Sequence, residues 1–216
     1  DINGRKAIEY ALDVPKILKV SGIDGTPVNQ LIPPELPGSD STVTKYLYDL
    51  QKSKQLLASV KNLTTPLIFD YPAGDELQAN EIAAELNAVG FNVKPTLVSD
   101  FSQFVGNING AKADIFFLGY SSSILDGFDI INNVIGSTAN YQSAQLNDLL
   151  SKGNKTFDPS QRIKLMQQME QIIAKDVPVV PLFNENYVYS SNKPYIFKVD
   201  IPGGDYGIKF WQMYQK

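Results

Sequence analysis

The residue types best able to do chemistry are gathered just after an apolar run at positions 116–118. They comprise a phenol, three short hydroxyls and two carboxylates: Tyr120, Ser121, Ser122, Ser123, Asp126 and Asp129. Glycoside hydrolysis needs two carboxylates about 5–10 Å apart, and the spacing of these two acids on a turn allows that separation. Asp is also a common cap at the start of a helix, so capping by Asp126 or Asp129 is the favoured interpretation.

The composition removes most other catalytic chemistry. The chain has no histidine and no cysteine, which excludes serine–histidine triads, thiol nucleophiles and the commonest zinc sites. No general base lies near the serines in sequence. What remains can bind a polar solute: the ring face and hydroxyl of Tyr120, the short donors and acceptors of the serines, and Asp126 as a charge-assisted acceptor. We expect no metal and no cofactor.

The charge of the chain limits its partners. The net charge is −4 at pH 7, and the 19 lysines and arginines are scattered, so no face for a nucleic-acid backbone can be recognised. No apolar run approaches the ~20 residues of a membrane-spanning helix. A helical pattern begins directly after Asp1, so we expect no signal peptide in these residues.

A regular alternation of strands and helices is predicted to position the candidate residues. The expected elements are strands at 66–71, 91–98 and 113–119, and helices at 75–89 and from Asp100 onward. Pro95 argues for an edge or a break in the second strand. The order predicts a parallel or mixed sheet flanked by helices, with ligands bound beyond the carboxyl ends of the strands, where Tyr120 follows.

Further elements are expected on both sides of this alternation. The patterns predict helices at 4–12, with Asn3 as the N-cap, and at 13–20, 49–60, 142–152 and 159–175. The last helix buries a stripe of Ile163, Met166, Met169 and Ile173. Strand-like runs lie at 179–183, 187–191 and 196–201, and the proline-rich stretch 21–40 is predicted to be ordered.

The order of these features resembles the extracellular solute-binding proteins of the oligopeptide, dipeptide and nickel class, which deliver ligands to ABC importers. Residues 5–13 (RKAIEYALD) are similar to the family's R-x-A-[IL]-x-x-A-[IL]-D helix. Residues 113–120 (ADIFFLGY) are similar to its ADI…GW strand. The most specific match is residues 158–182, from DPSQR to IAKDVPVVPL, and the resemblance spans nearly the whole chain.

The resemblance implies an α/β lobe of the type II periplasmic-binding-protein class, with a mixed sheet flanked by helices. It also implies that residues 1–216 are a single domain, the C-terminal lobe of a two-lobed protein whose N-terminal lobe and export signal are missing. The implied partners are a small polar solute, that missing lobe and the membrane subunits of an ABC importer. The implied location is extracellular or periplasmic, with membrane anchoring through the absent N-terminus.

The sequence departs from the family pattern at the opening stretch. Peptide binders of the class read Gly-Trp-x-x-Asp, and the acid is implied to meet the ligand's ammonium group. Here Tyr120 stands for the Trp, Ser123 for that acid, and Asp126 matches a second Asp. An ammonium left unpaired in a closed cleft costs several kcal/mol. Either Asp126 takes over, or the ligand carries no ammonium, as in an oligosaccharide; a peptide held by its backbone also remains open.

Three functions are therefore compared. The leading hypothesis is capture of a peptide or oligosaccharide, without chemistry, by Tyr120, the serines 121–123 and Asp126. The second is a sensory or docking module built on the same lobe. The third is a carboxylate-dependent glycosidase that uses Asp126 and Asp129.

Overall fold

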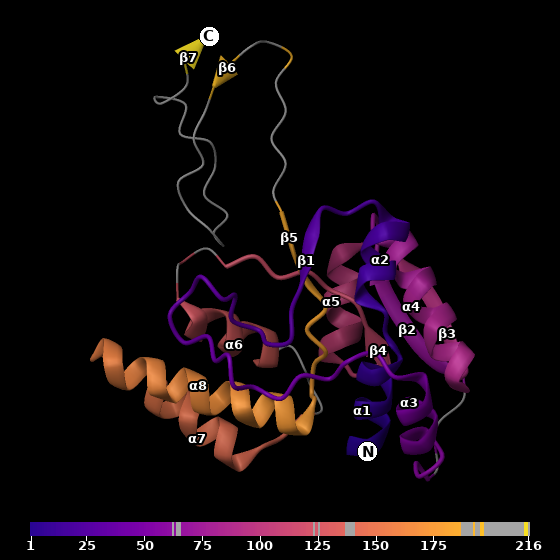
Figure 1. Ribbon diagram of the computed structural model, residues 1–216, viewed down its shortest axis with the longest axis horizontal. Coiled ribbons are helices and arrows are strands. Elements are labelled where there is room, and N and C mark those ends of the chain that lie inside the picture. The colour runs from indigo at the N-terminus through magenta and orange to yellow at the C-terminus, as the bar shows by residue number, and fades with distance from the viewer. Residues whose placement is uncertain are drawn as a thin grey trace.

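The computed structural model shows two packed bodies joined side by side (Figure 1). An α/β body contains α1 to α5 and a parallel sheet, and a helical body contains α6 to α8. The structure describes residues 1–61, 63, 66–122, 124, 126–136, 141–186, 192, 195–196 and 214–215. Every helix over these residues is too short or too polar to span a bilayer.

The α/β body is built on the predicted alternation of strands and helices. Parallel strands β2 (Leu67–Pro72), β3 (Val93–Val98) and β4 (Ile115–Phe116) lie in the order β3-β2-β4. Helix α4 (Glu76–Val89) connects β2 to β3, and α5 (Phe101–Asn109) connects β3 to β4. Of the two outcomes predicted from Pro95, an edge or a break, the structure shows the edge, because among the described residues β3 pairs only with β2.

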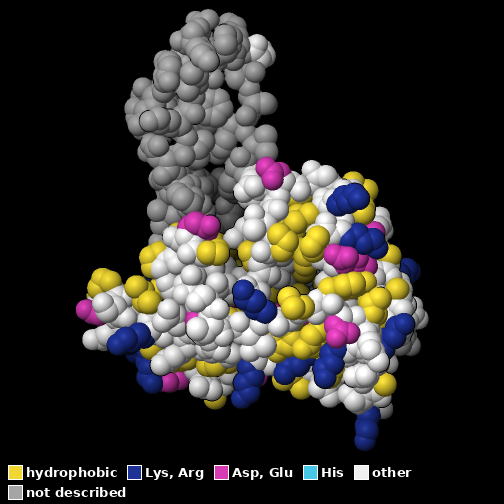
Figure 2. All heavy atoms as spheres, viewed as in Figure 1, with side chains coloured by type: hydrophobic (Ala, Val, Ile, Leu, Met, Phe, Trp, Pro, Cys, Tyr) yellow, Lys and Arg dark blue, Asp and Glu magenta, His cyan; other side chains and the backbone are white. Residues whose placement is uncertain are grey.

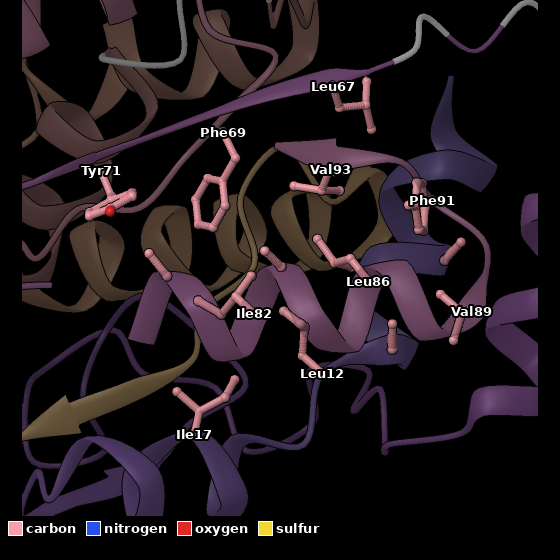
Figure 3. Packing of buried hydrophobic residues seen from close by; sticks show 14 residues of the cluster. Leu12, Ile17, Leu67, Phe69, Tyr71, Ile82, Leu86, Val89, Phe91 and Val93 are labelled. Atoms are coloured by element: carbon pink, nitrogen blue, oxygen red, sulfur yellow. The ribbon is translucent and has the colours of Figure 1, made fainter. Parts of the chain in front are cut away.

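Alternate side chains of β2 face the two helix layers. Phe69 is buried against Ile82 and Leu86 of α4 in the main core, which Figure 3 shows. Asp70 points to the opposite face, where its carboxylate accepts a hydrogen bond of 2.8 Å from Asn107 of α5. The two helices therefore cover opposite faces of the sheet.

Three N-terminal helices complete this body: α1 (Ile2–Ala11), α2 (Val14–Ser21) and α3 (Leu50–Leu57). The prediction of Asn3 as the first N-cap is wrong, because the Asp1 carboxylate accepts from the N–H groups of Asn3 and Gly4. Asn3 lies inside the helix, and its amide donates to Ser59.

The helical body consists of α6 (Gly127–Gly136), α7 (Ala144–Gly153) and α8 (Pro159–Asp176). The stripe predicted for α8 is confirmed at Met166, Met169 and Ile173, which are buried in a second core. The stretch 21–40 is ordered, as predicted, and Ile32 is fully buried in this core. The start of helix α6 agrees with the capping role favoured for Asp126, but the extent of this helix was not predicted.

Glu170 of α8 fixes the proline-rich stretch to the helical body. Its carboxylate, 0% exposed, accepts hydrogen bonds from the N–H groups of Ile32 at 2.7 Å and Leu31 at 3.3 Å. Burial raises the pKa of Glu170 to about 7, although these two hydrogen bonds act to lower it.

The two bodies meet at the C-terminal end of α8. Arg5 of α1 donates from Nε and Nη2 to the carbonyl oxygen of Asp176, at 2.9 and 2.7 Å. Tyr141 donates to the Asp176 carboxylate, and Tyr46 donates to the carbonyl of Ala174. Arg5 and Tyr46 thereby satisfy two of the carbonyl groups that a helix end leaves without intrahelical partners.

The remaining strands are short. β1 (Gly25–Pro27) pairs antiparallel with β5 (Phe183–Glu185), and β6 (Tyr195–Ile196) pairs with β7 (Tyr214–Gln215). The strand predicted at 179–183 is wrong in extent, because β5 begins at Phe183. The strand predicted at 187–191 lies outside the described residues, as does most of the one at 196–201.

The face in Figure 2 shows two further properties of the surface. Hydrophobic side chains gather over the part of the molecule that holds α1 to α4 in Figure 1. Lysines, arginines and acids are interspersed on this face, which therefore presents no broad basic area.

Candidate ligand-binding site

Tyr120 lies where the chain leaves β4 and crosses toward α6. The residue is 42% exposed, and its hydroxyl donates a hydrogen bond of 2.9 Å to Oδ2 of Asp129. Desolvation of the phenol, and secondly the hydrogen bond to Asp129, raise the pKa of Tyr120 to about 12. The ring is thus held at one end and open to solvent over part of its surface.

The three predicted serines differ in their environments. Ser122 is buried, and its Oγ lies 2.8 Å from Asp129 Oδ2 and 2.6 Å from the Ile124 carbonyl. Ser121 is exposed. Ser123 lies outside the described residues, so its predicted role stays a prediction.

Asp129 is the centre of this group, and the sequence interpretation missed its role. Besides accepting from Tyr120 and Ser122, it accepts at Oδ1 from the amide of Asn133, at 2.9 Å. Asp129 and Asn133 lie one helical turn apart on α6. That spacing could have suggested their contact, had α6 been recognised.

Asp126 is occupied by contacts within the protein. Its Oδ2 accepts from Arg162 of α8, at 2.5 Å from Nη2 and 3.2 Å from Nε. Its Oδ1 accepts from the N–H of Phe128 at 3.0 Å, as a residue that caps a helix start would do. The Arg162 guanidinium also lies 4.4 Å from the centre of the Phe128 ring. The negative charge of Asp126 is therefore paired.

A large gap lies between the two bodies beside Tyr120. It has a volume of about 580 Å³ and is lined by side chains of both cores, including Ile8, Phe69 and Ile130. Among the predicted site residues that the structure describes, Tyr120 belongs to its lining, whereas Ser121, Ser122 and Asp126 do not. Because Tyr120 is also partly exposed, it lies at the edge of the gap.

The arrangement supports binding better than catalysis. Asp126 and Asp129, the acids considered for glycoside hydrolysis, are engaged by Arg162 in one case and by Tyr120, Ser122 and Asn133 in the other. Over the described residues, no group of three or more acids could hold a metal ion.

Comparison with known protein families decides the class. Residues 1–142 match the family described as bacterial extracellular solute-binding proteins, family 5, middle region. The chain belongs to this family. The sequence motifs had suggested a resemblance to this family, and that prediction is confirmed.

The family 5 chain is similar to curated and structurally known relatives. It is 27% identical over 203 residues to the probable D,D-dipeptide-binding periplasmic protein DdpA of Escherichia coli K12, covering 88% of this chain and 39% of the relative. It is also 27% identical to the periplasmic binding protein DppA of Helicobacter pylori, solved in complex with the peptide STSA. That comparison has a TM-score of 0.74 and covers 85% of this chain and 38% of the other.

A third structure is the periplasmic oligopeptide-binding protein of Thermotoga maritima with bound mannohexaose, with a TM-score of 0.73, 21% identity, and 90% and 43% of the two chains covered. At this identity the similarity shows the fold. The predicted type II periplasmic-binding-protein class, an α/β lobe with helices on its sheet, is confirmed. The family 5 chain spans about two fifths of the length of these relatives.

Proposed function

We propose that residues 1–216 are the C-terminal lobe of a two-lobed solute-binding protein, which captures a ligand between its lobes and delivers it to an ABC importer. Two observations support this: the family match, and the fact that the chain corresponds to only 39% of the length of DdpA. The protein then acts outside the cytoplasmic membrane, and its partners are a second lobe and the membrane subunits of the importer. Anchoring to the membrane belongs to the part of the protein outside these residues.

The observation that carries the ligand site is the orientation of Tyr120. Its hydroxyl proton is donated to Asp129, so the oxygen can only accept a hydrogen bond from a ligand. Tyr120 as a whole residue is 42% exposed, and its ring offers an apolar surface. Tyr120 therefore contacts the ligand as a ring face with one acceptor, and Ser121 and Ser123 supply further polar contacts at the same strand end.

The ligand class that fits best is a peptide. The two relatives at 27% identity are named as a dipeptide binder and as a binding protein in complex with a peptide. Peptide N–H groups are donors that can share the Tyr120 oxygen as an acceptor with the Asn133 amide. Because Asp126 is paired with Arg162, this lobe offers no free carboxylate there for an ammonium group. The ligand's terminal ammonium is met by the other lobe.

An oligosaccharide is the second candidate. Sugar hydroxyls can donate to Tyr120 and to the neighbouring serines. A sugar also has no ammonium group, so it does not need the acid that Ser123 replaces. A sensory or docking use of the lobe would need the same ligand contacts but no importer. The glycosidase hypothesis is not adopted, because both of its acids are bound within the protein.

Titration calorimetry of the two-lobed protein with di- to tetrapeptides and with oligosaccharides tests the proposal. We expect saturable binding of peptides, weakened about 10-fold or more when Tyr120→Ala removes the aromatic contact. Tyr48→Ala is the matched control, because Tyr48 is 47% exposed and lies outside the lining of the gap. Equal affinity of the two variants would reject Tyr120 as a contact, and no binding of either ligand class would reject the function.

A further inference from the structure

The chain between β1 and α3 runs along α8 before it returns to the α/β body (Figure 1). This bridging segment, residues 28–49, contains the sequence Ile-Pro-Pro at 32–34, none of which lines the gap beside Tyr120. The segment bonds to α8 at positions 167, 170, 171 and 174, which lie three or four apart and therefore on one face of the helix. The bonded pairs are Ser39 and Gln167, Ile32 and Glu170, Asp40 and Gln171, and Tyr46 and Ala174.

Ile32 is constrained on both sides of its backbone. Its N–H donates to the buried Glu170 carboxylate at 2.7 Å. The residue that follows is Pro33, which disfavours the helical conformation for Ile32 and restricts it to extended backbone. The side chain of Ile32 is 0% exposed in the second core. Ile32 therefore has little freedom to move away from a neighbour.

That neighbour is Gly127, the buried first residue of α6. A Cβ built at position 127 would lie 2.6 Å from Cδ1 of Ile32, and 2.9 Å from both its Cγ1 and its Cγ2. Side-chain carbons do not approach one another so closely, and a packed core gives neither residue room to yield. The glycine therefore allows α6 to begin directly against the Ile32 side chain.

The same turn of α6 carries the acid that orients Tyr120. Asp129 lies two residues after Gly127 and accepts from the Tyr120 hydroxyl at 2.9 Å. A hydrogen bond of this kind depends on its length and angle, so a small shift of the first turn changes how Tyr120 is held. A continuous set of contacts thus leads from Glu170 to Ile32, from Ile32 to Gly127, and from the turn that begins there to Tyr120.

We propose that Ile32 is a positioning residue for the ligand site. Through its contact with Gly127 it sets the first turn of α6, and Asp129 on that turn then holds Tyr120 in the orientation that receives the ligand. Glu170 supports the arrangement by fixing the backbone of Ile32. Ligand affinity therefore depends on a core side chain that does not line the gap. This inference rests on the proposed function, because it takes Tyr120 as the ligand contact.

A purely structural role for Ile32 makes a different prediction. If Ile32 only fills the second core, its loss lowers the stability of the protein but leaves the environment of Tyr120 unchanged. Two readouts on the two-lobed protein separate these roles. One is the fluorine NMR signal of Tyr120 in protein labelled with 3-fluorotyrosine and free of ligand, assigned by its loss in Tyr120→Phe. The other is the peptide affinity measured by titration calorimetry.

Gly127→Ala should shift the Tyr120 signal and weaken peptide binding about 10-fold, because the added methyl group displaces the first turn of α6. Ile32→Ala removes all three atoms that this methyl group would meet, so the double variant should lie closer to wild type in both readouts than Gly127→Ala does. Leu149→Ala, in the same core, is the control and should lower stability alone. Independent effects of the two substitutions, or an equal shift of the Tyr120 signal in Leu149→Ala, would overturn the proposal.

A second pair of variants does not depend on whether Gly127→Ala folds. Glu170→Gln keeps an acceptor for the Ile32 N–H, whereas Glu170→Leu removes both carboxylate oxygens. We expect the Tyr120 signal to shift in Glu170→Leu and to stay at the wild-type position in Glu170→Gln. The same signal in both variants would contradict the proposal. The NMR readout needs no ligand, so it decides the role of Ile32 even if the titrations reject the proposed function.

Discussion

The hydroxyl of Tyr120 and the carboxylate of Asp129 are joined by a hydrogen bond of 2.9 Å, which ties the end of the β4 segment to the first turn of α6. The same carboxylate accepts from Asn133 and lies 2.8 Å from Ser122 Oγ. One acid therefore orients the aromatic side chain that we propose as the ligand contact. Removing the charge of Asp129 should therefore change the pKa of Tyr120.

Asp129→Asn should lower the pKa of Tyr120 from about 12. The carboxylate favours the neutral phenol because it accepts a hydrogen bond from the hydroxyl and repels the phenolate. A neutral amide has a weaker effect of both kinds. Alkaline titration of tyrosinate absorbance, taken as the difference from Tyr120→Phe, measures this pKa. Asp148→Asn is the control, since Asp148 pairs with Lys152 on the surface. An unchanged titration in Asp129→Asn would show that the hydrogen bond is absent in solution.

Glu170→Gln should stabilise the protein at pH 8 and have little benefit near pH 5. Burial raises the folded-state pKa of Glu170 from 4.5 to about 7, so its contribution to stability is full below 4.5 and is lost as the pH rises through about 7. The shift corresponds to about 3 kcal/mol across that range. Gln stays neutral and retains one acceptor for the Ile32 N–H.

Urea unfolding at the two pH values, with the exposed Glu35→Gln as control, measures this effect. Part of the loss of stability between pH 5 and 8 should persist in Glu170→Gln, because burial also raises the pKa of Glu9 from 4.5 to about 8. If wild type and Glu170→Gln lose stability in parallel from pH 5 to 8, Glu170 is not the titrating group.

Gly153→Ala should destabilise the helical body by about 1–3 kcal/mol, because overpacking forces neighbours out of place. A Cβ at position 153 would overlap Cε2 of Phe128. Gly106→Ala in α5 is the matched control, since no atom lies within 4 Å of its Cβ position. That change should be neutral or stabilising by up to about 1 kcal/mol, as Ala is the better helix former. Thermal unfolding of both variants distinguishes close packing from a general effect of the added methyl group.

Arg162→Met should cost about 2–3 kcal/mol of stability, because it leaves the half-buried Asp126 without its charged partner. It also removes the donor to the Gly153 carbonyl. Lys152→Met is the comparison. The Lys152–Asp148 pair is exposed, so its loss should cost less than about 1 kcal/mol of stability. Similar losses in the two variants, measured by urea unfolding, would mean that the Asp126–Arg162 pair is effectively solvated.

The sequence was most informative where a local pattern determines the structure. The strands at 66–71 and 91–98, the helix that ends at Gly90 and the Met166–Met169 stripe follow from residue periodicity and were found. The extent of helix α6 was missed because Gly127, Asn132 and Asn133 are weak helix formers, and the helix is stabilised by burial of Phe128 and Ile131.

The candidate site was less accessible from sequence. Tyr120 could be placed at a strand end, but its bond to Asp129 depends on where α6 packs. Likewise, no local signal indicated that Arg162 would occupy Asp126, because the two residues meet only through packing of α6 and α8. The length of β4 was overestimated because strand length depends on neighbours as well as on composition.

The contact of Arg5 with the Asp176 carbonyl has a mechanical consequence. Two donors of one planar guanidinium hold a single oxygen, so any displacement of the end of α8 is transmitted to the first helix of the chain. Tyr46 and Tyr141 reinforce the same point from two other segments. If the two-lobed protein closes around its ligand by a hinge motion, we expect this junction to make the α/β body and the helical body move together as one unit. The bending must then occur outside the region between α1 and α8.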